Sequence, residues 1–142
     1  MIDLPFIDAH RQPTVADAAK TWNALVATLS RDLSNERFAR LLGCAPATRG
    51  GDWSGDLGDA TITGFAVTES RRPARIELRG SHHFSRYALV FVIDDASITA
   101  ESYGEFPGWR GKAYRAMVIG SGAHRVIVRR LLRRIARRAA TA

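Results

Sequence analysis

The C-terminal third of the chain, residues 107–142, constrains the fold more than any other stretch. Small or apolar side chains recur there at three- and four-residue spacing, which places them on one stripe of a helix. The stripe consists of Tyr114, Met117, Ser121, His124, Val128, Leu131 and Ile135. This spacing predicts one long helix over 107–142, with its stripe buried against another layer of the protein.

Two glycines interrupt this stripe, at Gly120 and Gly122. Each costs about 1 kcal/mol relative to alanine inside a helix, and together they leave little side-chain volume on that turn. One interpretation is that the thin turn makes room for a closely packed sheet or for a ligand. The alternative is that the glycines are simply tolerated, or divide the segment into two shorter helices.

The excess charge of the chain lies at the same end. The sequence has 21 basic and 14 acidic residues, a net charge of +7. Seven arginines and no acid lie in 125–138, so residues 1–124 are neutral. The run is either a solvated outer face or a contact for an anionic membrane or acidic partner. The contact residues would be Arg129, Arg130, Arg133 and Arg134. Nucleic acid is disfavoured as a partner, because the body of the chain carries no basic excess.

The composition argues against several other classes of protein. A length of 142 residues predicts a single domain over 1–142, and 46% apolar residues argue against disorder. No apolar run approaches the ~18 residues needed to span a bilayer, and no secretory signal is evident. Cys44 is the single cysteine, so no internal disulfide can form and we expect a cytoplasmic protein. No phosphate loop or zinc spacing is present, so no metal and no cofactor are predicted.

The first part of the chain predicts a strand followed by two helices. The strand covers 6–12, and Thr14 is expected to cap the next helix with Asp17 in the position of a capping-box acid. The apolar face of that helix consists of Ala18, Trp22, Leu25 and Leu29. A shorter helix is expected over 34–43 and a loop over 45–58, in which Trp53 is an anchor on the core or part of a lid.

The middle of the chain predicts a meander of strands. Strands are expected over 61–70, 74–84, 86–93 and 97–106, with short turns between them. The third is apolar on both faces, so we expect a central strand that is covered on both sides or faces a partner. Short turns between consecutive strands imply an antiparallel sheet, and a twisted sheet that curls around a helix leaves a cavity between the two.

This order of elements resembles the START-like superfamily, also called SRPBCC, which includes polyketide cyclases/dehydrases and lipid-transfer proteins. The segment 16–25, ADAAKTWNAL, is similar to the family's opening, in which an acid-containing cap leads into a helix with the pattern W-x-x-L. The helix after Phe106, Pro107 and Gly108 lies where the family places its pocket-covering helix. The distinct strand that the family often has before the 61–70 strand is not evident in 47–58.

The resemblance implies an α+β helix-grip fold, in which a curved antiparallel sheet wraps around a long C-terminal helix after two short helices. It also implies an apolar cavity that binds a hydrophobic small molecule. Some members are enzymes, whereas many only bind or carry ligands, and the fold alone does not choose between these.

Two histidines are the candidate acid–base residues, His82 and His124. Strand alternation from Ile76 and Leu78 points His82 inward, and His124 falls on the inward stripe of the last helix. The alternative for each is a core or rim histidine bonded to backbone. The candidate ligand-binding residues are Trp22, Leu78, His82, Tyr87, Phe91, Ser102, Met117, Ser121 and His124. The apolar members of this set can equally be plain core.

The register of the last strand decides which side chains face the cavity. Ala100, Ser102 and Gly104 alternate with Glu101 and Tyr103. We expect the small set to lie under the helix; the opposite register would make Glu101 and Tyr103 polar pocket groups.

Three functions fit the sequence. The favoured one is a non-catalytic binder or carrier of a hydrophobic metabolite. The second is a cyclase/dehydratase-like enzyme with His82 or His124 as acid or base. The third is an interaction module that uses the arginine-rich helix end.

Overall fold

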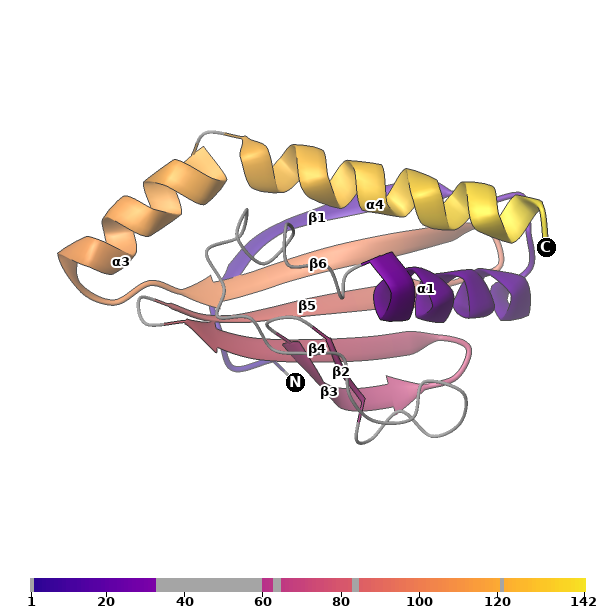
Figure 1. The fold of residues 1–142 in the computed structure, drawn as a ribbon, viewed down its shortest axis with the longest axis horizontal. Helices are drawn as coiled ribbons and strands as arrows, with labels where there is room; N and C mark the ends of the chain where they lie inside the picture. The colour runs from indigo at the N-terminus through magenta and orange to yellow at the C-terminus, as the bar shows by residue number, and fades with distance from the viewer. Residues whose placement is uncertain (1, 33–59, 63–64, 83–84, 121) are drawn as a thin grey trace.

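The protein is built on a curved antiparallel sheet (Figure 1). The computed structural model describes residues 2–32, 60–62, 65–82, 85–120 and 122–142. Six strands pair in the order β1-β6-β5-β4-β3-β2. Their bounds are β1 Phe6–Pro13, β2 Thr61–Ile62, β3 Phe65–Arg71, β4 Arg75–His82, β5 Ser85–Ile93 and β6 Ser97–Glu105. The predicted antiparallel meander is therefore confirmed, and the first strand lies at the edge beside the last.

Two helices cover one face of this sheet, α1 Ala18–Asp32 and α4 Ala123–Ala140 (Figure 1). They pack on each other, α4 also packs on β1 and β6, and α1 reaches β5. A further α-helix, α3 Gly108–Arg115, precedes a π-helical turn, η2 Ala116–Gly120. The arrangement of curved sheet and C-terminal helix is the expected helix grip.

The core lies at one end of the grip, between α1, the later part of α4 and the middle of the sheet. Ile76 of β4, Phe91 of β5 and Ile98 of β6 share the covered face and are fully buried. Five buried side chains of the two helices belong to the same core cluster: Trp22, Leu25, Leu29, Leu132 and Ile135. We call this the closed end of the grip.

The N-terminus of α1 differs from the prediction in its capping residue. The helix begins at Ala18, and Asp17 rather than Thr14 is the N-cap: its Oδ1 accepts a hydrogen bond from the backbone N–H of Lys20 at 2.8 Å. The Asp17 side chain satisfies one of the helix's orphan N–H groups directly. The expected apolar face of the helix is nevertheless correct, since Trp22, Leu25 and Leu29 are buried.

The C-terminal segment is not one continuous helix, and the predicted alternative of a break at the glycines is correct. The chain passes through η2 and then Gly122, which has a φ of +81° and lies at the N-cap of α4. That left-handed conformation favours glycine. An added Cβ would meet nothing within 4 Å at Gly120 or Gly122, so backbone conformation at Gly122, rather than close packing, accounts for the break.

The opposite face of the sheet carries charged side chains. As expected, Glu101 and Tyr103 lie on this outer face, while Ala100 and Ser102 lie under the helices and are buried. Val90 of the central strand is fully buried between its cross-strand neighbours Glu77 and Glu101. Glu77 is itself buried and accepts a 2.6 Å hydrogen bond from Arg79. Long polar side chains thus cover the outer side of the central strand.

Several predicted features lie outside the described residues: the helix over 34–43, the loop over 45–58 with Trp53, and Ser121. In the described part of the chain, none of the helices combines the length and apolar character needed to cross a bilayer.

The packing of α4 can be tested by truncating one core side chain. We expect Ile135→Ala to lower the free energy of unfolding by about 2–5 kcal/mol, because Ile135 is fully buried and its removal leaves a cavity. Val126→Ala, at a half-exposed position of the same helix, should change it by no more than about 0.5 kcal/mol. Urea unfolding measures both, and equal effects would contradict the described orientation of α4.

Candidate functional site

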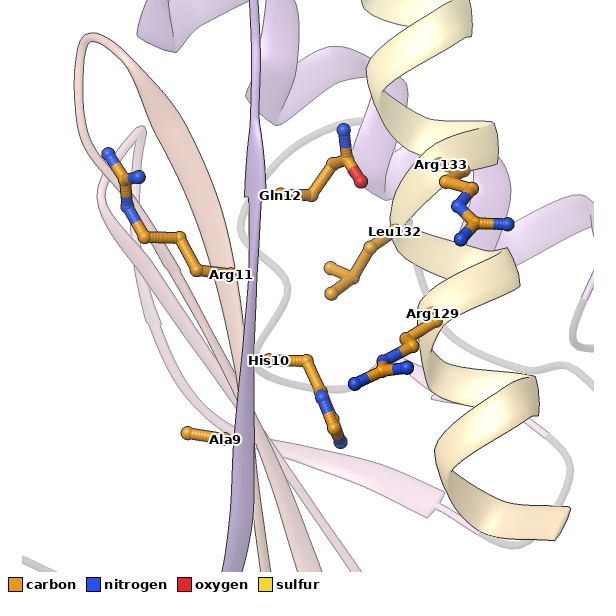
Figure 2. A pocket seen from close by; sticks show the side chains of 7 residues that line it. All are labelled: Ala9, His10, Arg11, Gln12, Arg129, Leu132 and Arg133. Atoms are coloured by element: carbon orange, nitrogen blue, oxygen red, sulfur yellow. The ribbon is translucent and has the colours of Figure 1, made fainter. Parts of the chain in front are cut away.

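The contact between β1 and α4 is polar, unlike the apolar packing between α1 and α4. Alternate residues of β1 face α4, namely Asp8, His10 and Gln12, whereas Ala9 and Arg11 point to the other side of the strand (Figure 2). On α4, His124 and Arg129 face this strand, and Arg133 lines the groove between them while its guanidinium is directed away from β1. We call these six residues the polar seam.

One end of the seam is a cluster around the carboxylate of Asp8. His10 Nε2 lies 3.2 Å from Asp8 Oδ2, within hydrogen-bond distance, and an N–H on that nitrogen would donate to the carboxylate. His124 Nε2 lies 2.9 Å from the hydroxyl of Ser102 and 3.6 Å from Asp8 Oδ1. Two histidines from different elements therefore flank one carboxylate.

The protonation of His124 is set mainly by its burial. Its side chain is 18% exposed. Burial lowers the pKa of His124 below its usual value, the nearby charge of Asp8 opposes this, and His10 adds to the lowering. His124 is therefore predominantly neutral at pH 7, and its Nε2 can exchange a hydrogen bond with Ser102 in either direction.

One oxygen of Asp8 remains without a donor. Oδ1 is buried and accepts no hydrogen bond from the described part of the chain, because 3.6 Å from His124 is too long for one. An unsatisfied buried acceptor is costly. A hydroxyl or N–H brought to this oxygen would relieve that cost.

The cluster is not arranged as a nucleophilic triad. Both Ser102 and Asp8 approach the same nitrogen of His124, whereas the serine–histidine–aspartate mechanism needs them on opposite nitrogens. Among the described residues, no three acidic, histidine or cysteine side chains are placed to hold a metal ion. The geometry suits binding or proton transfer at His124 better than either of these chemistries.

The other end of the seam is an open groove of about 290 Å³ between β1 and α4 (Figure 2). His10 and Gln12 line it from the strand, and Arg129, Leu132 and Arg133 line it from the helix. No ion pair of Arg129 or Arg133 is found in the described ranges. The groove is therefore cationic and suited to a small anionic group.

Half-buried apolar side chains gather on the covered face of the sheet, beyond the closed end. Tyr87 packs edge-on against Phe65, with ring centroids 5.0 Å apart. Its cross-strand neighbours on both sides are glycines, one of them Gly104. A Cβ on Gly104 would lie 2.9 Å from the ring of Phe106 and 3.0 Å from Ile7, so a larger residue there would displace these side chains. We call Ile7, Phe65, Tyr87 and Phe106 the apolar wall.

The predicted site residues fall into separate groups. Trp22, Leu78 and Phe91 belong to the fully buried core, Tyr87 to the apolar wall, and Ser102 and His124 to the Asp8 cluster. Met117 is 68% exposed on η2. His82 ends β4 opposite Ser85, and its side chain, like Ser121, is outside what the structure describes. Among the predicted polar residues whose side chains the structure describes, it thus brings together Ser102 and His124.

Sequence reasoning missed Asp8, His10 and Gln12, although a signal was present. The three polar residues alternate along β1 with the period of a strand. Such a line of polar groups on the covered side of a strand indicates a buried polar site rather than ordinary core.

No family model matches the chain, and no curated protein matches it. Among solved structures, one similar chain is that of CalU16 from Micromonospora echinospora. It is 12% identical, with a TM-score of 0.45 over 94% of this chain and 83% of that one. Another is protein Ms6760 from Mycobacterium smegmatis, 13% identical, with a TM-score of 0.43 over 92% of this chain and 94% of that one. The helix-grip assignment rests on the strands and helices of this chain itself.

The electrostatics of the Asp8 cluster can be tested by titration. NMR should give His124 a pKa below the ordinary value of about 6.5. Because the unfolded chain then binds a proton more readily, His124 should make the free energy of unfolding fall as the pH drops through about 6.5. This fall should be absent in His124→Gln.

The effect of the Asp8 charge on the pKa of His124 can be tested separately. Asp8→Asn should lower the pKa of His124 further, because the carboxylate charge favours the protonated imidazole. Asp95→Asn, at an exposed turn, is the matched control and should leave that pKa unchanged. A pKa for His124 at or above that of free histidine would contradict the described burial.

Proposed function

We propose that the protein binds a small, largely apolar molecule on the covered face of its sheet, beside the polar seam. The observation that carries this proposal is the buried Oδ1 of Asp8, which lacks a donor in the described part of the chain and lies beside a neutral His124. A ligand hydroxyl would satisfy that oxygen. Small-molecule sites combine mostly apolar linings with a few such polar groups.

The apolar part of the ligand would lie on the apolar wall. Tyr87, Phe65, Phe106 and Ile7 are half-buried, so each retains apolar surface that a ligand can cover. At the closed end, Trp22, Phe91 and Ile135 are already fully buried. The ligand is therefore assigned to the part of the covered face beyond that core.

The proposed role is binding or carrying rather than catalysis. Asp8, Ser102 and His124 can recognise a polar group by hydrogen bonds alone, and binding needs no further chemistry. The helix-grip fold is compatible with such a role, although fold does not determine function.

A second candidate function is acid–base catalysis of the cyclase/dehydratase kind. The observation that favours it is the lowered pKa of the largely buried His124, which keeps the imidazole neutral and able to accept a proton near pH 7. Turnover separates the two functions: an enzyme would convert the bound molecule and lose that turnover in His124→Gln, whereas a binder would leave the molecule unchanged in the wild type and in the variant.

Binding can be measured with Nile red, a neutral apolar dye, by fluorescence titration. Tyr87→Ala should weaken dye binding by roughly tenfold or more, since burying a large apolar side chain is worth about 1.5–3 kcal/mol. Tyr103→Ala is the matched control, because Tyr103 is a half-buried tyrosine on the outer face of the same sheet. It should bind the dye as the wild type does.

Native mass spectrometry of the purified protein gives a second measurement. We expect an added mass from a co-purifying apolar compound, reduced in Asp8→Asn and in Tyr87→Ala. Absence of any added mass, together with Nile red binding that Tyr87→Ala does not change, would refute the proposal.

A further inference from the structure

The basic residues of the chain are segregated more sharply than the arginine run alone indicates. Residues 107–142 contain ten basic residues and no acidic one, because Arg110, Lys112 and Arg115 of α3 add to the seven of α4. The remaining 106 residues hold 11 basic and 14 acidic residues, a net charge of −3. The body and the C-terminal helices therefore have opposite net charge.

The structure places this charge on the outside of α4. Val128, Leu131, Leu132 and Ile135 face the core, so the opposite side of the helix presents Arg130, Arg133 and Arg137, all exposed. Like charges four residues apart, such as Arg129 and Arg133, repel each other on a helix. No acid of the described chain forms an ion pair with Arg129, Arg130 or Arg133. A negatively charged surface would relieve this repulsion.

Exposed apolar side chains lie among these charges. Trp109 on α3 is 76% exposed, Met117 on η2 is 68% exposed and Val126 on α4 is 49% exposed. The guanidinium of Arg110 lies 5.2 Å from the centre of the Trp109 ring. In Figure 1, α3 extends away from the sheet, and α3 and α4 together form one border of the molecule. The basic border thus also carries side chains that water solvates poorly.

This combination fits the surface of a lipid bilayer better than a nucleic acid. Phosphates of either partner would attract the arginines. Of these two partners, the bilayer is the one whose interfacial zone accepts tryptophan together with aliphatic side chains such as Met117 and Val126. The groove beside Arg129 and Arg133 is cationic and open, so it can receive the phosphate of one headgroup at the edge of this border.

We propose that α3, η2 and the exposed side of α4 form a docking surface for an anionic lipid bilayer. Trp109 and Met117 enter the interfacial zone, and the arginines of α4 bind the headgroup phosphates. This proposal does not depend on the ligand proposed above, since none of its residues belongs to the apolar wall or the Asp8 cluster.

Flotation with vesicles tests this surface. The full chain is mixed with vesicles of phosphatidylcholine alone or of phosphatidylcholine with phosphatidylglycerol. We expect binding only to the second kind, with affinity that falls as sodium chloride is added. Arg129→Gln with Arg133→Gln should weaken binding roughly tenfold or more, because each basic residue near an anionic surface contributes independently.

Three further variants make the result specific. Arg71→Gln with Arg72→Gln changes net charge equally at two exposed positions, at the end of β3 and in the turn that follows it, and should bind vesicles as the wild type does. Trp109→Ala should also weaken vesicle binding, while Trp109→Phe restores most of it. Circular dichroism checks that each variant is folded.

Three results would overturn the proposal. The first is equal binding to both kinds of vesicle, and the second is equal loss in the two double variants. The third is binding to a DNA duplex that matches vesicle binding in strength and is unaffected by Trp109→Ala, which would identify a nucleic-acid surface instead.

Discussion

The described structure depends on the burial of one apolar stripe of α4. Val128, Leu131, Leu132 and Ile135 lie between α1 and the covered face of the sheet, and they fix the position of the helix. Burial of apolar surface is the dominant favourable contribution to folding. Because α4 is held on this side, its other sides are left to polar contacts: the seam with β1 and the arginines toward solvent. The proposed ligand site and the proposed membrane-docking surface both depend on this position of α4.

The sequence predicted the sheet well because strand alternation and turn residues are local signals. The β6 register was predictable because small residues, such as Ala100 and Ser102, alternate with large ones and pack under a helix. The cap of α1 was misassigned since Thr14 and Asp17 both have capping side chains, and only backbone geometry decides between them. The sequence could not decide between one continuous helix and a break before α4, because glycine is compatible with a helix as well as with the left-handed φ of Gly122.

The site was harder to predict, because its parts are distant in the sequence. Asp8 and His124 meet only through the pairing of β1 with β6 and the packing of α4 over them. His124 and Ser102 were identified from periodicity, but their hydrogen bond is a tertiary contact. The same packing shows why the arginine run is not uniform: Arg129 and Arg133 line a groove, whereas Arg138 hydrogen-bonds to Thr28 of α1.

The position of β1 also affects the order in which this protein can fold. Its sole described pairing partner is β6, so Asp8 aligns with a residue more than ninety positions later, Ser102. During synthesis, the first strand emerges long before its partner exists. Contacts between such distant residues close late and slow folding. We therefore expect the meander to form first by short-range pairing, and the Asp8 cluster to assemble afterwards, together with the docking of α4.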